Sequence, residues 1–284
     1  MQNKAISPYK VLNIRGRLVD LEQPRIMGII NVTPDSFYAG SRQTHLSDWL
    51  KQAENMLTQG ATFLDIGGYS SRPGAEDVPE AEEWRRVGPA IETIRKHFPE
   101  ALLSIDTFRA RIAHHAVQEG ADMVNDIRAG EGDERMFETI ASLRIPYVIM
   151  HMRGTPQTMT TLTEYTDVTH EVIDYFYPKI YQLTKSGVKD IILDPGFGFA
   201  KTPAQGFQLL RQLDALHVLS KPVMVGLSRK SMIWKTLQTS ATEALNGTTV
   251  LNTIALIKGA SILRVHDVAE ARECISLVQA LEGK

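Results

Sequence analysis

The sequence predicts a single (β/α)8 barrel, or TIM barrel, preceded by a β-hairpin. Eight short apolar runs recur along the chain, and nearly every run ends in a polar, charged or glycine-rich cluster. Segments with a helical spacing of apolar residues separate the runs, and this alternation is typical of parallel α/β folds. The 284 residues suit one barrel of this kind, which takes about 250 residues.

The hairpin comes first in the chain. Residues 9–23 contain two apolar runs around a turn at Arg15 and Gly16, and we expect this hairpin to cover the bottom of the barrel. The barrel is assigned to residues 26–284, so that 1–284 form one domain. The eight strands are expected at Ile26–Ile30, Thr62–Ile66, Leu102–Ile105, Asp122–Val124, Tyr147–Met150, Asp190–Leu193, Pro222–Val225 and Ser261–Val265.

Helices are expected between the strands. One buried stripe is marked by Val87, Ile91 and Ile94, which recur at helical spacing. The last helix contains the single cysteine, Cys274, beside its apolar face, and this position favours an inert, packed thiol. Residues 166–185 predict a longer helix with a kink or break near Tyr177, because the proline that follows lacks an N–H group.

Composition excludes several classes of function. The formal net charge of −2 and the isoelectric point near 6.5 do not indicate a nucleic-acid or membrane-surface binder, so an anionic substrate must be met by local cations. The N-terminus lacks a secretory segment, and no apolar run approaches the ~20 residues of a membrane helix. We therefore expect a cytoplasmic protein with small-molecule substrates.

Three carboxylates each end an apolar run. Asp65, Asp106 and Asp194 are expected at the carboxyl ends of strands, where the active site of this fold lies. For Asp65 we favour helix capping, because an aspartate before a helix is common. For Asp106 and Asp194 we favour a ligand-binding role, and Asn125 offers a donor and an acceptor at the same edge.

Cations gather late in the sequence. Residues 228–231 read Ser-Arg-Lys-Ser after the seventh expected strand, and Arg264 and His266 flank the end of the eighth. The loops after these two strands often bind phosphate in this fold. A rim salt bridge for Arg264 and a structural cap for His266 remain alternatives. The gathering of cations in a chain without net positive charge favours an anionic ligand.

The ordered motifs closely resemble those of the dihydropteroate synthase family. Residues 27–37 read Met-Gly-Ile-Ile-Asn-Val-Thr-Pro-Asp-Ser-Phe, and residues 193–199 read Leu-Asp-Pro-Gly-Phe-Gly-Phe. Further matching segments are 65–68, 71–75, 104–107, 124–127, 150–154, 226–231 and 264–268. The resemblance implies a transferase that condenses 6-hydroxymethyl-7,8-dihydropterin diphosphate with 4-aminobenzoate. It also implies a homodimer and a target of sulfonamides.

The family's residues can be carried over by motif. The implied pterin-binding residues are Asp106, Asn125, Ile127, Met150, Asp194, Phe199, Gly226 and Lys230. The diphosphate would be met by Asn31, Arg72, Arg264 and His266, with Asn31 also at a Mg²⁺ ion. The implied 4-aminobenzoate residues are Thr33, Pro34, Phe37, Ser71, Pro73 and Ser231. Catalytic roles would fall to Asp35, Arg72, Lys230 and Arg264.

Elementary chemistry agrees with this reaction. A pterin presents parallel N–H donors that one carboxylate can accept, so Asp194 is a sensible anchor. Arg264, His266 and Mg²⁺ can stabilise the departing diphosphate. Loss of diphosphate leaves a delocalised pterin cation, which Asp35 is placed to stabilise, and the arylamine attacks without a strong base.

Local departures and rival functions are expected to matter little. Tyr69, Ala39, Ser41, Arg128 and Ala200 differ from common family residues, which bears on loop behaviour and sulfonamide response. A pterin-dependent methyltransferase would lack the two loops that this sequence has after its first and second expected strands. A non-catalytic pterin-binding homologue would have lost loop or phosphate residues that this chain keeps.

Overall fold

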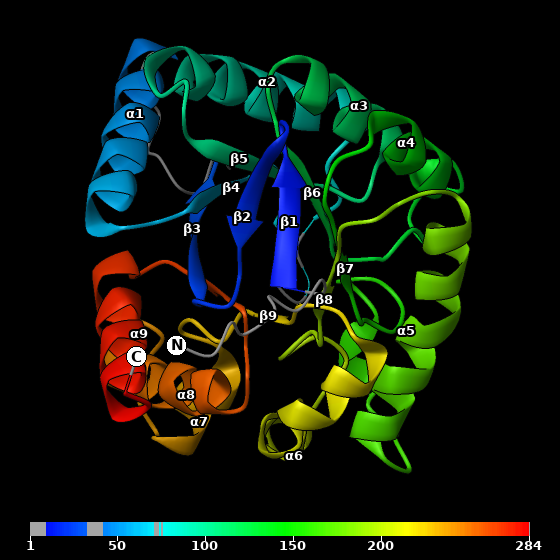
Figure 1. Ribbon diagram of the computed structural model, residues 1–284, viewed down its shortest axis with the longest axis vertical. Coiled ribbons are helices and arrows are strands. Elements are labelled where there is room, and N and C mark those ends of the chain that lie inside the picture. The colour runs from blue at the N-terminus through cyan, green and yellow to red at the C-terminus, as the bar shows by residue number, and fades with distance from the viewer. Residues whose placement is uncertain (1–9, 33–41, 71–73, 75, 284) are drawn as a thin grey trace, which may run out of the picture.

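Eight parallel strands form a ring at the centre of the computed structural model, which describes residues 10–32, 42–70, 74 and 76–283. The strands are β3 (Arg25–Asn31), β4 (Phe63–Gly67), β5 (Leu102–Asp106), β6 (Met123–Asp126), β7 (Tyr147–Met150), β8 (Ile191–Asp194), β9 (Met224–Val225) and β10 (Ile262–Val265). Each strand from β3 to β7 pairs with the strand that follows it, β10 pairs with β3, and β9 pairs with β10. A parallel bridge between Leu193 and Val223 closes the ring. The predicted (β/α)8 barrel and its eight strands are confirmed, and they lie in the middle of Figure 1.

Alternation along each strand separates the outer core from the barrel interior. In β5, Leu103 and Ile105 belong to the large cluster that packs against the helices. Successive strand residues point to opposite faces, so Ser104 and Asp106 point into the barrel. The interior of the barrel is apolar near the strand starts, where Met27 and Phe63 are fully buried, and polar near the strand ends.

The hairpin closes the bottom of the barrel, as the sequence predicts. It consists of β1 (Val11–Ile14) and the antiparallel β2 (Arg17–Asp20). Leu12, Ile14 and Leu21 share one buried cluster with interior residues from the starts of the barrel strands. In Figure 1 the hairpin crosses in front of the ring of strands. The apolar residues of the hairpin therefore seal the end of the barrel opposite the strand carboxyl ends.

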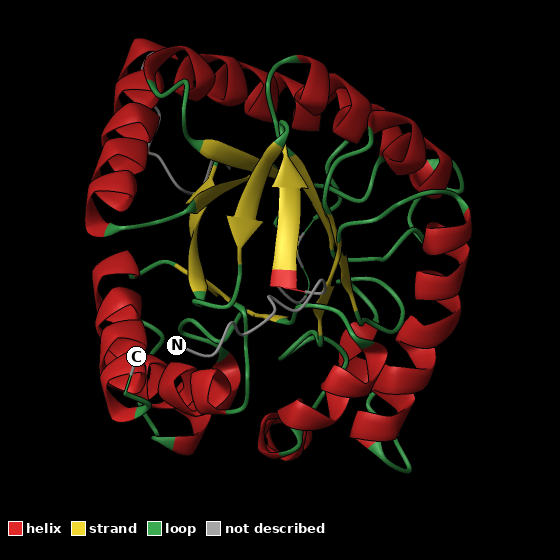
Figure 2. Cartoon of the chain, viewed as in Figure 1, coloured by secondary structure: helices red, strands yellow, loops and turns green. Residues whose placement is uncertain are grey.

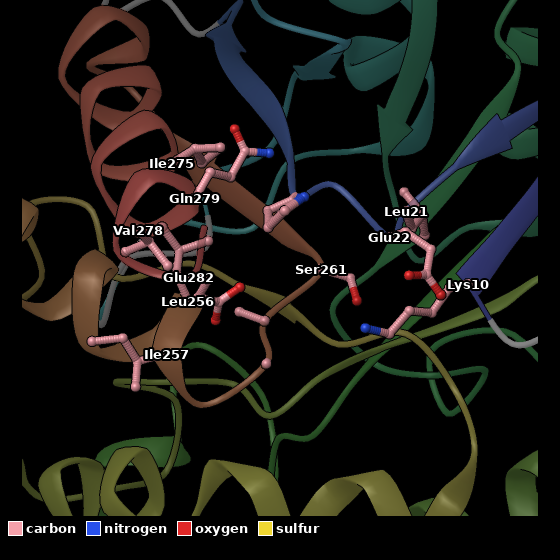
Figure 3. Close-up of a pocket in the computed structure, with 13 residues that line it drawn as sticks. Lys10, Leu21, Glu22, Leu256, Ile257, Ser261, Ile275, Val278, Gln279 and Glu282 are labelled. Atoms are coloured by element: carbon pink, nitrogen blue, oxygen red, sulfur yellow. The ribbon is translucent and has the colours of Figure 1, made fainter. Parts of the chain in front are cut away.

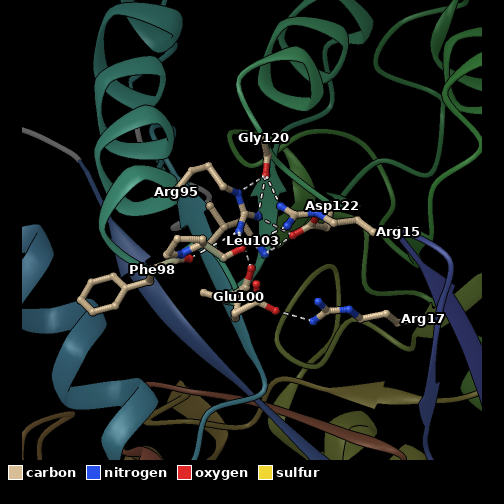
Figure 4. A network of polar contacts seen from close by, with 10 residues as sticks. Arg15, Arg17, Arg95, Phe98, Glu100, Leu103, Gly120 and Asp122 are labelled. Atoms are coloured by element: carbon tan, nitrogen blue, oxygen red, sulfur yellow. Dashed lines mark hydrogen bonds and ion pairs between the residues drawn. The ribbon is translucent and has the colours of Figure 1, made fainter.

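A polar network fixes the hairpin to the barrel, and Figure 4 shows its members. Arg15 and Gly16 form a two-residue turn with φ values of 52° and 75°, the left-handed geometry that tight hairpins favour. The Arg15 guanidinium binds Asp122, which also accepts from Arg95 Nη2 at 2.6 Å. Asp122 further accepts from the backbone N–H of Leu103 at 2.8 Å. One buried carboxylate thus links the hairpin to two barrel segments.

The helices surround the ring of strands, as Figure 2 shows. They are α1 (Arg42–Gln59), α2 (Glu80–His97), α3 (Ala110–Gln118), α4 (Met136–Leu143), α5 (Val168–Lys185), α6 (Pro203–Arg211), α7 (Ser231–Thr236), α8 (Leu245–Ile257) and α9 (Val268–Leu281), with the 3-10 helices η3 (Met159–Thr161) and η4 (Leu213–Leu219). Cys274 is buried in α9, as expected. Within the described ranges, no helix combines the length and apolar character needed to cross a membrane.

Of the kink or break expected near Tyr177, the break is wrong, because α5 continues through Pro178. Pro178 and Asp174 both lie on the exposed side of the helix. Water can therefore satisfy the Asp174 carbonyl that the proline leaves without an intrahelical partner. Val172, Phe176 and Leu183 are fully buried, and their packing holds both halves of the helix against the barrel.

Candidate functional site

Polar side chains from five barrel strands converge at the carboxyl ends of the strands. They are Asp65 on β4, Asp106 on β5, Asn125 on β6, Asp194 on β8 and Arg264 on β10. Each occupies an interior position of its strand, one or two pleats above the apolar bottom layer. We call this set the polar rim. The fold therefore brings together residues that are up to 199 positions apart in the sequence.

Arg264 joins two carboxylates across the polar rim. Its Nε lies 2.7 Å from Asp65 Oδ2, and its Nη2 lies 2.7 Å from Asp106 Oδ2. Asn125 Nδ2 donates to the same Asp65 oxygen at 2.9 Å. Burial raises the pKa of Asp106 to about 7, although the Arg264 charge opposes the rise. Burial alone would lower the pKa of Arg264, but the carboxylates of Asp65 and Asp106 outweigh it and raise the pKa above its usual range.

The helix-capping interpretation of Asp65 is wrong. The following helix, α2, begins at Glu80 with Pro79 as its N-cap residue. Asp65 instead lies inside β4, is fully buried, and has one oxygen, Oδ1, without a hydrogen-bond partner among the described residues. The period of two could have placed it, because Phe63 and Asp65 point to the same side of β4. For Arg264, the rim salt bridge that the sequence left open is present.

Asp194 and Lys230 form the second charged part of the site. Asp194 is buried, and its Oδ1 accepts from the Gly196 N–H at 2.8 Å. Burial raises the pKa of Asp194, while the Lys230 charge and the Gly196 N–H hold it down. Burial also lowers the pKa of Lys230 to about 8. Each group therefore favours the charged form of the other, although no direct ion pair joins them.

Lys230 is held at the N-terminus of α7, where its side chain turns back toward the β8 loop. Its ammonium donates to the Phe197 carbonyl and lies 4.7 Å from the centre of the Phe199 ring. A Cβ at Gly226 would lie 3.8 Å from the same nitrogen, so the glycine leaves room beside it. The expected neighbours Asp194, Phe199, Gly226 and Lys230 are thus brought together.

An apolar wall stands beside these charges. A separate buried cluster contains Ile127, Met150, Met152, Met159 and Ala200, with Phe108 and Phe199 packed against it. Three of the expected pterin-pocket residues, Ile127, Met150 and Phe199, therefore share this wall. A flat ring that lies against such a wall can reach the polar rim with its edge.

The loop after β6 owes its shape to Asp126. This buried carboxylate accepts from the backbone N–H groups of Arg128 and Gly130, each at 2.8 Å, and from the Tyr147 hydroxyl at 2.5 Å. Burial raises the pKa of Asp126, and these donors oppose the rise. Asp126 thus orders the chain directly after Asn125 without belonging to the polar rim.

The expected cation cluster is divided by the fold. Arg264 lies in β10 and His266 directly follows it, while Asn31 ends β3, the strand that pairs with β10. His266 is exposed, and its Nδ1 lies 3.1 Å from Ser228 Oγ. Arg229, however, binds Asp267 through two contacts of 2.9 Å. Arg229 is therefore held away from any ligand, while Arg264 and His266 stay at the rim with Asn31.

Two functional candidates were missed by sequence reasoning. Lys201 and His151 are buried next to each other in the loops that follow β8 and β7, and Lys201 Nζ lies 2.8 Å from His151 Nδ1. The glycine-rich stretch that precedes Lys201 forms a tight turn, with φ values of 70° at Gly196 and 78° at Gly198. A lysine after a glycine-rich turn normally indicates an exposed cation, so no signal in the sequence revealed its burial.

Several expected residues lie outside the described residues. They are Thr33, Pro34, Asp35, Phe37, Ala39, Ser41, Ser71, Arg72 and Pro73. Tyr69, which precedes one of these segments, is described and buried. Its hydroxyl accepts from Gln157 Nε2 at 3.2 Å, and its ring meets Phe108 edge-on at 5.1 Å. The Tyr69 departure thus ties the end of β4 to the loop after β7. Ser231 begins α7 directly after Lys230.

Two cavities lie at the opposite end of the barrel. The first, of about 120 Å³, is shown in Figure 3 and lies between the hairpin and the segments before β3 and β10, with Leu21, Glu22 and Ser261 in its lining. The second, of about 770 Å³, is lined by Asn13, Asp190 and the loops that enter β6, β7 and β8. Both are formed by the starts of strands. They are therefore remote from the polar rim.

Comparison with known proteins identifies similar chains of similar length. The family described as pterin binding enzyme matches residues 27–266. A curated relative, the dihydropteroate synthase of Escherichia coli K12, is 40% identical over 268 residues and 94% of each chain. The Yersinia pestis dihydropteroate synthase, solved with a sulfonamide drug, superposes with a TM-score of 0.90 at 39% identity, covering 96% of this chain and 100% of that one. The Xanthomonas albilineans enzyme, solved with 4-aminobenzoic acid, has a TM-score of 0.90 at 38% identity, covering 97% and 99%.

Proposed function

Because this chain belongs to the pterin-binding enzyme family and, within it, to the dihydropteroate synthases, we propose that its polar rim binds a pterin diphosphate and transfers the pterin to an arylamine. The enzyme is a transferase of folate biosynthesis. It condenses 6-hydroxymethyl-7,8-dihydropterin diphosphate with 4-aminobenzoate, and the products are 7,8-dihydropteroate and diphosphate.

The convergence of Asp106, Asn125, Asp194 and Lys230 around one apolar wall carries this proposal. A pterin edge presents the amino group and ring nitrogens, and a carboxylate that accepts two parallel N–H donors binds such an edge firmly. Asp194 is assigned this role because its charge is supported by Lys230 and the Gly196 N–H. Asn125 and Asp106 then form hydrogen bonds with the remaining polar atoms of the ring. Met150, Ile127 and Phe199 cover its faces.

Arg264 and His266 are assigned to the diphosphate. Nη1 of Arg264 takes part in neither of its two carboxylate contacts and is left for a phosphate oxygen. His266 is exposed at the same strand end. Cleavage breaks the bond between the pterin CH₂ and the diphosphate oxygen, and the electron pair leaves with the diphosphate. Positive groups in the polar rim stabilise the charge that develops there.

Asn31 is proposed as the protein ligand of a Mg²⁺ ion. No group of three or more His, Cys, Asp or Glu side chains suited to a metal occurs within the described ranges. Mg²⁺ that arrives with a diphosphate does not need such a group, because it usually keeps several waters and takes one or two protein ligands beside the phosphates. Asn31 ends β3, which pairs with the strand that carries Arg264, so its amide oxygen lies at the right end of the barrel for this limited role. When bound, the ion would neutralise charge on the departing diphosphate.

The arylamine completes the reaction. Its nitrogen lone pair attacks the CH₂ of the pterin cation, a C–N bond forms, and a proton leaves the nitrogen. Asp35 is proposed to stabilise the cation, and Arg72 and Ser231 are proposed to act at the aminobenzoate end. Thr33, Pro34, Phe37, Ser71 and Pro73 complete that end of the site. Sulfonamides carry a similar arylamine and are expected to compete for this place.

A homodimer is part of the proposal. The outer sides of the neighbouring helices α8 and α9 expose Val250, Ile254, Ile257, Leu277 and Leu281. Exposed apolar side chains gathered over two adjacent helices favour an interface with a second copy. We also propose a cytoplasmic location, because the charged substrates stay in the compartment where they are made.

One incubation tests the proposed function. The full chain is mixed with the pterin diphosphate, Mg²⁺ and 4-aminobenzoate, and diphosphate release is followed with and without the amine. Release that depends on the amine, with formation of 7,8-dihydropteroate, is the expected result. Pterin binding without release would support a non-catalytic homologue. No pterin binding would overturn the assignment of the polar rim.

A further inference from the structure

We propose that Lys201 and His151 form a positioning pair that holds the β8 loop in the shape needed by the pterin anchor Asp194. This inference rests on the proposed function and assigns residues that the reaction scheme above does not use. Lys201 follows residues 195–200, the loop after β8. His151 directly follows β7, the strand that pairs with β8. Both side chains are buried, with exposed fractions of 7% and 2%.

All three ammonium hydrogens of Lys201 have an acceptor. Nζ lies 2.8 Å from His151 Nδ1, 3.1 Å from the Gly196 carbonyl and 3.2 Å from the Phe199 carbonyl. A lysine ammonium has three donors and no acceptor capacity, so this set satisfies it fully. The loop carbonyls that Lys201 binds lie five and two residues before it. The side chain therefore ties the loop back onto its own end.

The fixed loop supports both charged groups of the second part of the site. Gly196 donates its N–H to Asp194 Oδ1 at 2.8 Å, and Lys201 binds the carbonyl of the same glycine. Phe199 contributes a ring face to Lys230, and Lys201 binds the Phe199 carbonyl. Lys201 thus acts on Asp194 and Lys230 through the loop backbone at Gly196 and Phe199.

Two other side chains also hold the loop, because Lys230 donates to the Phe197 carbonyl and the Tyr165 hydroxyl donates to the Ala200 carbonyl at 2.9 Å. Gly196 and Gly198 have positive φ values, and so does Ala200, at 48°. A Cβ at Gly196 would lie 2.0 Å from the His151 carbonyl oxygen, so the loop backbone packs directly on the β7 end. On its far side, Lys201 is followed by the Thr202–Gln205 capping box of α6. The capping box fixes the backbone at Lys201, and the side chain carries that order back into the loop.

His151 is suited to accept from an ammonium. Burial lowers its pKa to about 2, and the Lys201 charge acts in the same direction, so the ring is neutral at working pH. Burial lowers the pKa of Lys201 itself, the charges of Lys230 and Arg153 act in the same direction, and the Asp194 carboxylate opposes them and favours the ammonium. Asp194 in turn faces Lys230, Arg264 and Lys201. Loss of the Lys201 ammonium would remove one of three positive charges that favour the Asp194 carboxylate.

The first test compares Lys201→Met with Lys185→Met in the same protein. Lys185 ends the outer helix α5, where it is exposed and lies 4.8 Å from the centre of the Tyr181 ring, and it serves as the control. Calorimetric titration with the pterin diphosphate is expected to give Lys201→Met a dissociation constant at least about tenfold higher than wild type, whereas Lys185→Met stays within about threefold. The KM for 4-aminobenzoate is expected to change little in either variant.

A pH series separates positioning of Asp194 from a general structural role. Pterin binding weakens at low pH as Asp194 takes up a proton. Because one nearby positive charge is missing in Lys201→Met, the midpoint of this loss should move to higher pH by about half a unit or more. A variant that is merely less stable would keep the wild-type midpoint.

Variants of His151 keep the inference testable if Lys201→Met does not fold. His151→Asn retains an acceptor near the Nδ1 position and should bind pterin within about threefold of wild type, whereas His151→Leu should lose at least about tenfold. Equal affinities and equal pH midpoints for these two variants and the wild type would overturn the positioning role. If the wild type itself binds no pterin, the proposed function fails and this inference fails with it. Failure of the variants to differ, with an active wild type, refutes the inference alone.

Discussion

Replacing Arg264 by Met should destabilise the protein far more than the loss of an ordinary salt bridge. Arg264 is the shared partner of Asp65 and Asp106, at 2.7 Å from each. Without it, the fully buried Asp65 keeps only the Asn125 amide as a partner, and its Oδ1 already has none among the described residues. Removing one member of a buried charge network costs about 3–5 kcal/mol. That is a large share of the ~5–15 kcal/mol that stabilises a typical domain.

Urea unfolding at neutral pH, followed by circular dichroism, measures this change. Asp106 adds a pH signature, because burial raises its pKa to about 7 and loss of the Arg264 charge should raise it further. A carboxyl whose pKa is higher in the folded than in the unfolded chain favours folding at low pH. The loss of unfolding free energy in Arg264→Met should therefore shrink as the pH falls from the raised Asp106 pKa of the variant toward about 7, the value in the wild type. The double variant with Asp65→Asn should recover at least half of the loss.

Arg85→Met is the control for this experiment. Arg85 binds Glu82 at 2.6 Å, but its side chain is 60% exposed. Surface pairs of this kind contribute little to stability, because water screens their attraction. If Arg264→Met and Arg85→Met reduce the unfolding free energy equally, the account of the polar rim as a buried charge network is wrong.

Three further predictions follow from single contacts. Asp194→Asn replaces an acceptor pair by a mixed amide, so calorimetry should show pterin affinity reduced at least about tenfold, and unchanged affinity would remove Asp194 from the anchor role. Burial lowers the pKa of Lys230 to about 8, so kcat/KM should fall as the pH rises through this value. Lys230→Arg should abolish that fall. If the fall persists unchanged in this variant, another group is responsible for it. Arg15→Asn keeps the left-handed turn but removes the contact with Asp122, so the unfolding free energy should drop by about 1–2 kcal/mol while KM stays unchanged. A raised KM would contradict the view that the hairpin does not affect the polar rim.

The pattern of apolar runs was sufficient to predict most of the fold. A buried parallel strand reads as an apolar run, and eight such runs with helical spacing between them leave few alternatives to a closed barrel. The ends of these runs also located Asp106, Asn125 and Asp194, because a polar residue after an apolar run has no place in the core. What the runs alone did not give was the inward or outward direction of each residue. That direction moves Asp65 from a helix cap into the polar rim.

Other features depend on contacts that are distant in the sequence. Arg229 and Lys230 are adjacent cations, yet Arg229 meets Asp267 from the loop after β10 while Lys230 turns into the site. Their neighbours are brought close only by the closure of the barrel. The burial of Lys201 likewise requires His151 from another strand end. Pro178 was misjudged for the opposite reason, because a local rule was applied where the exposed side of a helix tolerates it.

The balance of charges explains how a chain with a net charge of −2 can serve an anionic substrate. Arg264 is held between Asp65 and Asp106, and Lys230 and Lys201 lie near Asp194, so each of these three positive groups has a carboxylate close by. The carboxylates are the groups that a pterin edge requires, and the cations are the groups that a diphosphate requires. Because each kind supports the ionised state of the other in a buried place, neither could be removed without changing the affinity for both ends of the same substrate. This coupling predicts that variants of the anchor and of the cations will be non-additive in pterin diphosphate binding, which a double-mutant cycle between Asp194→Asn and Arg264→Met measures. Strict additivity would mean that the two ends of the substrate are read by independent sites.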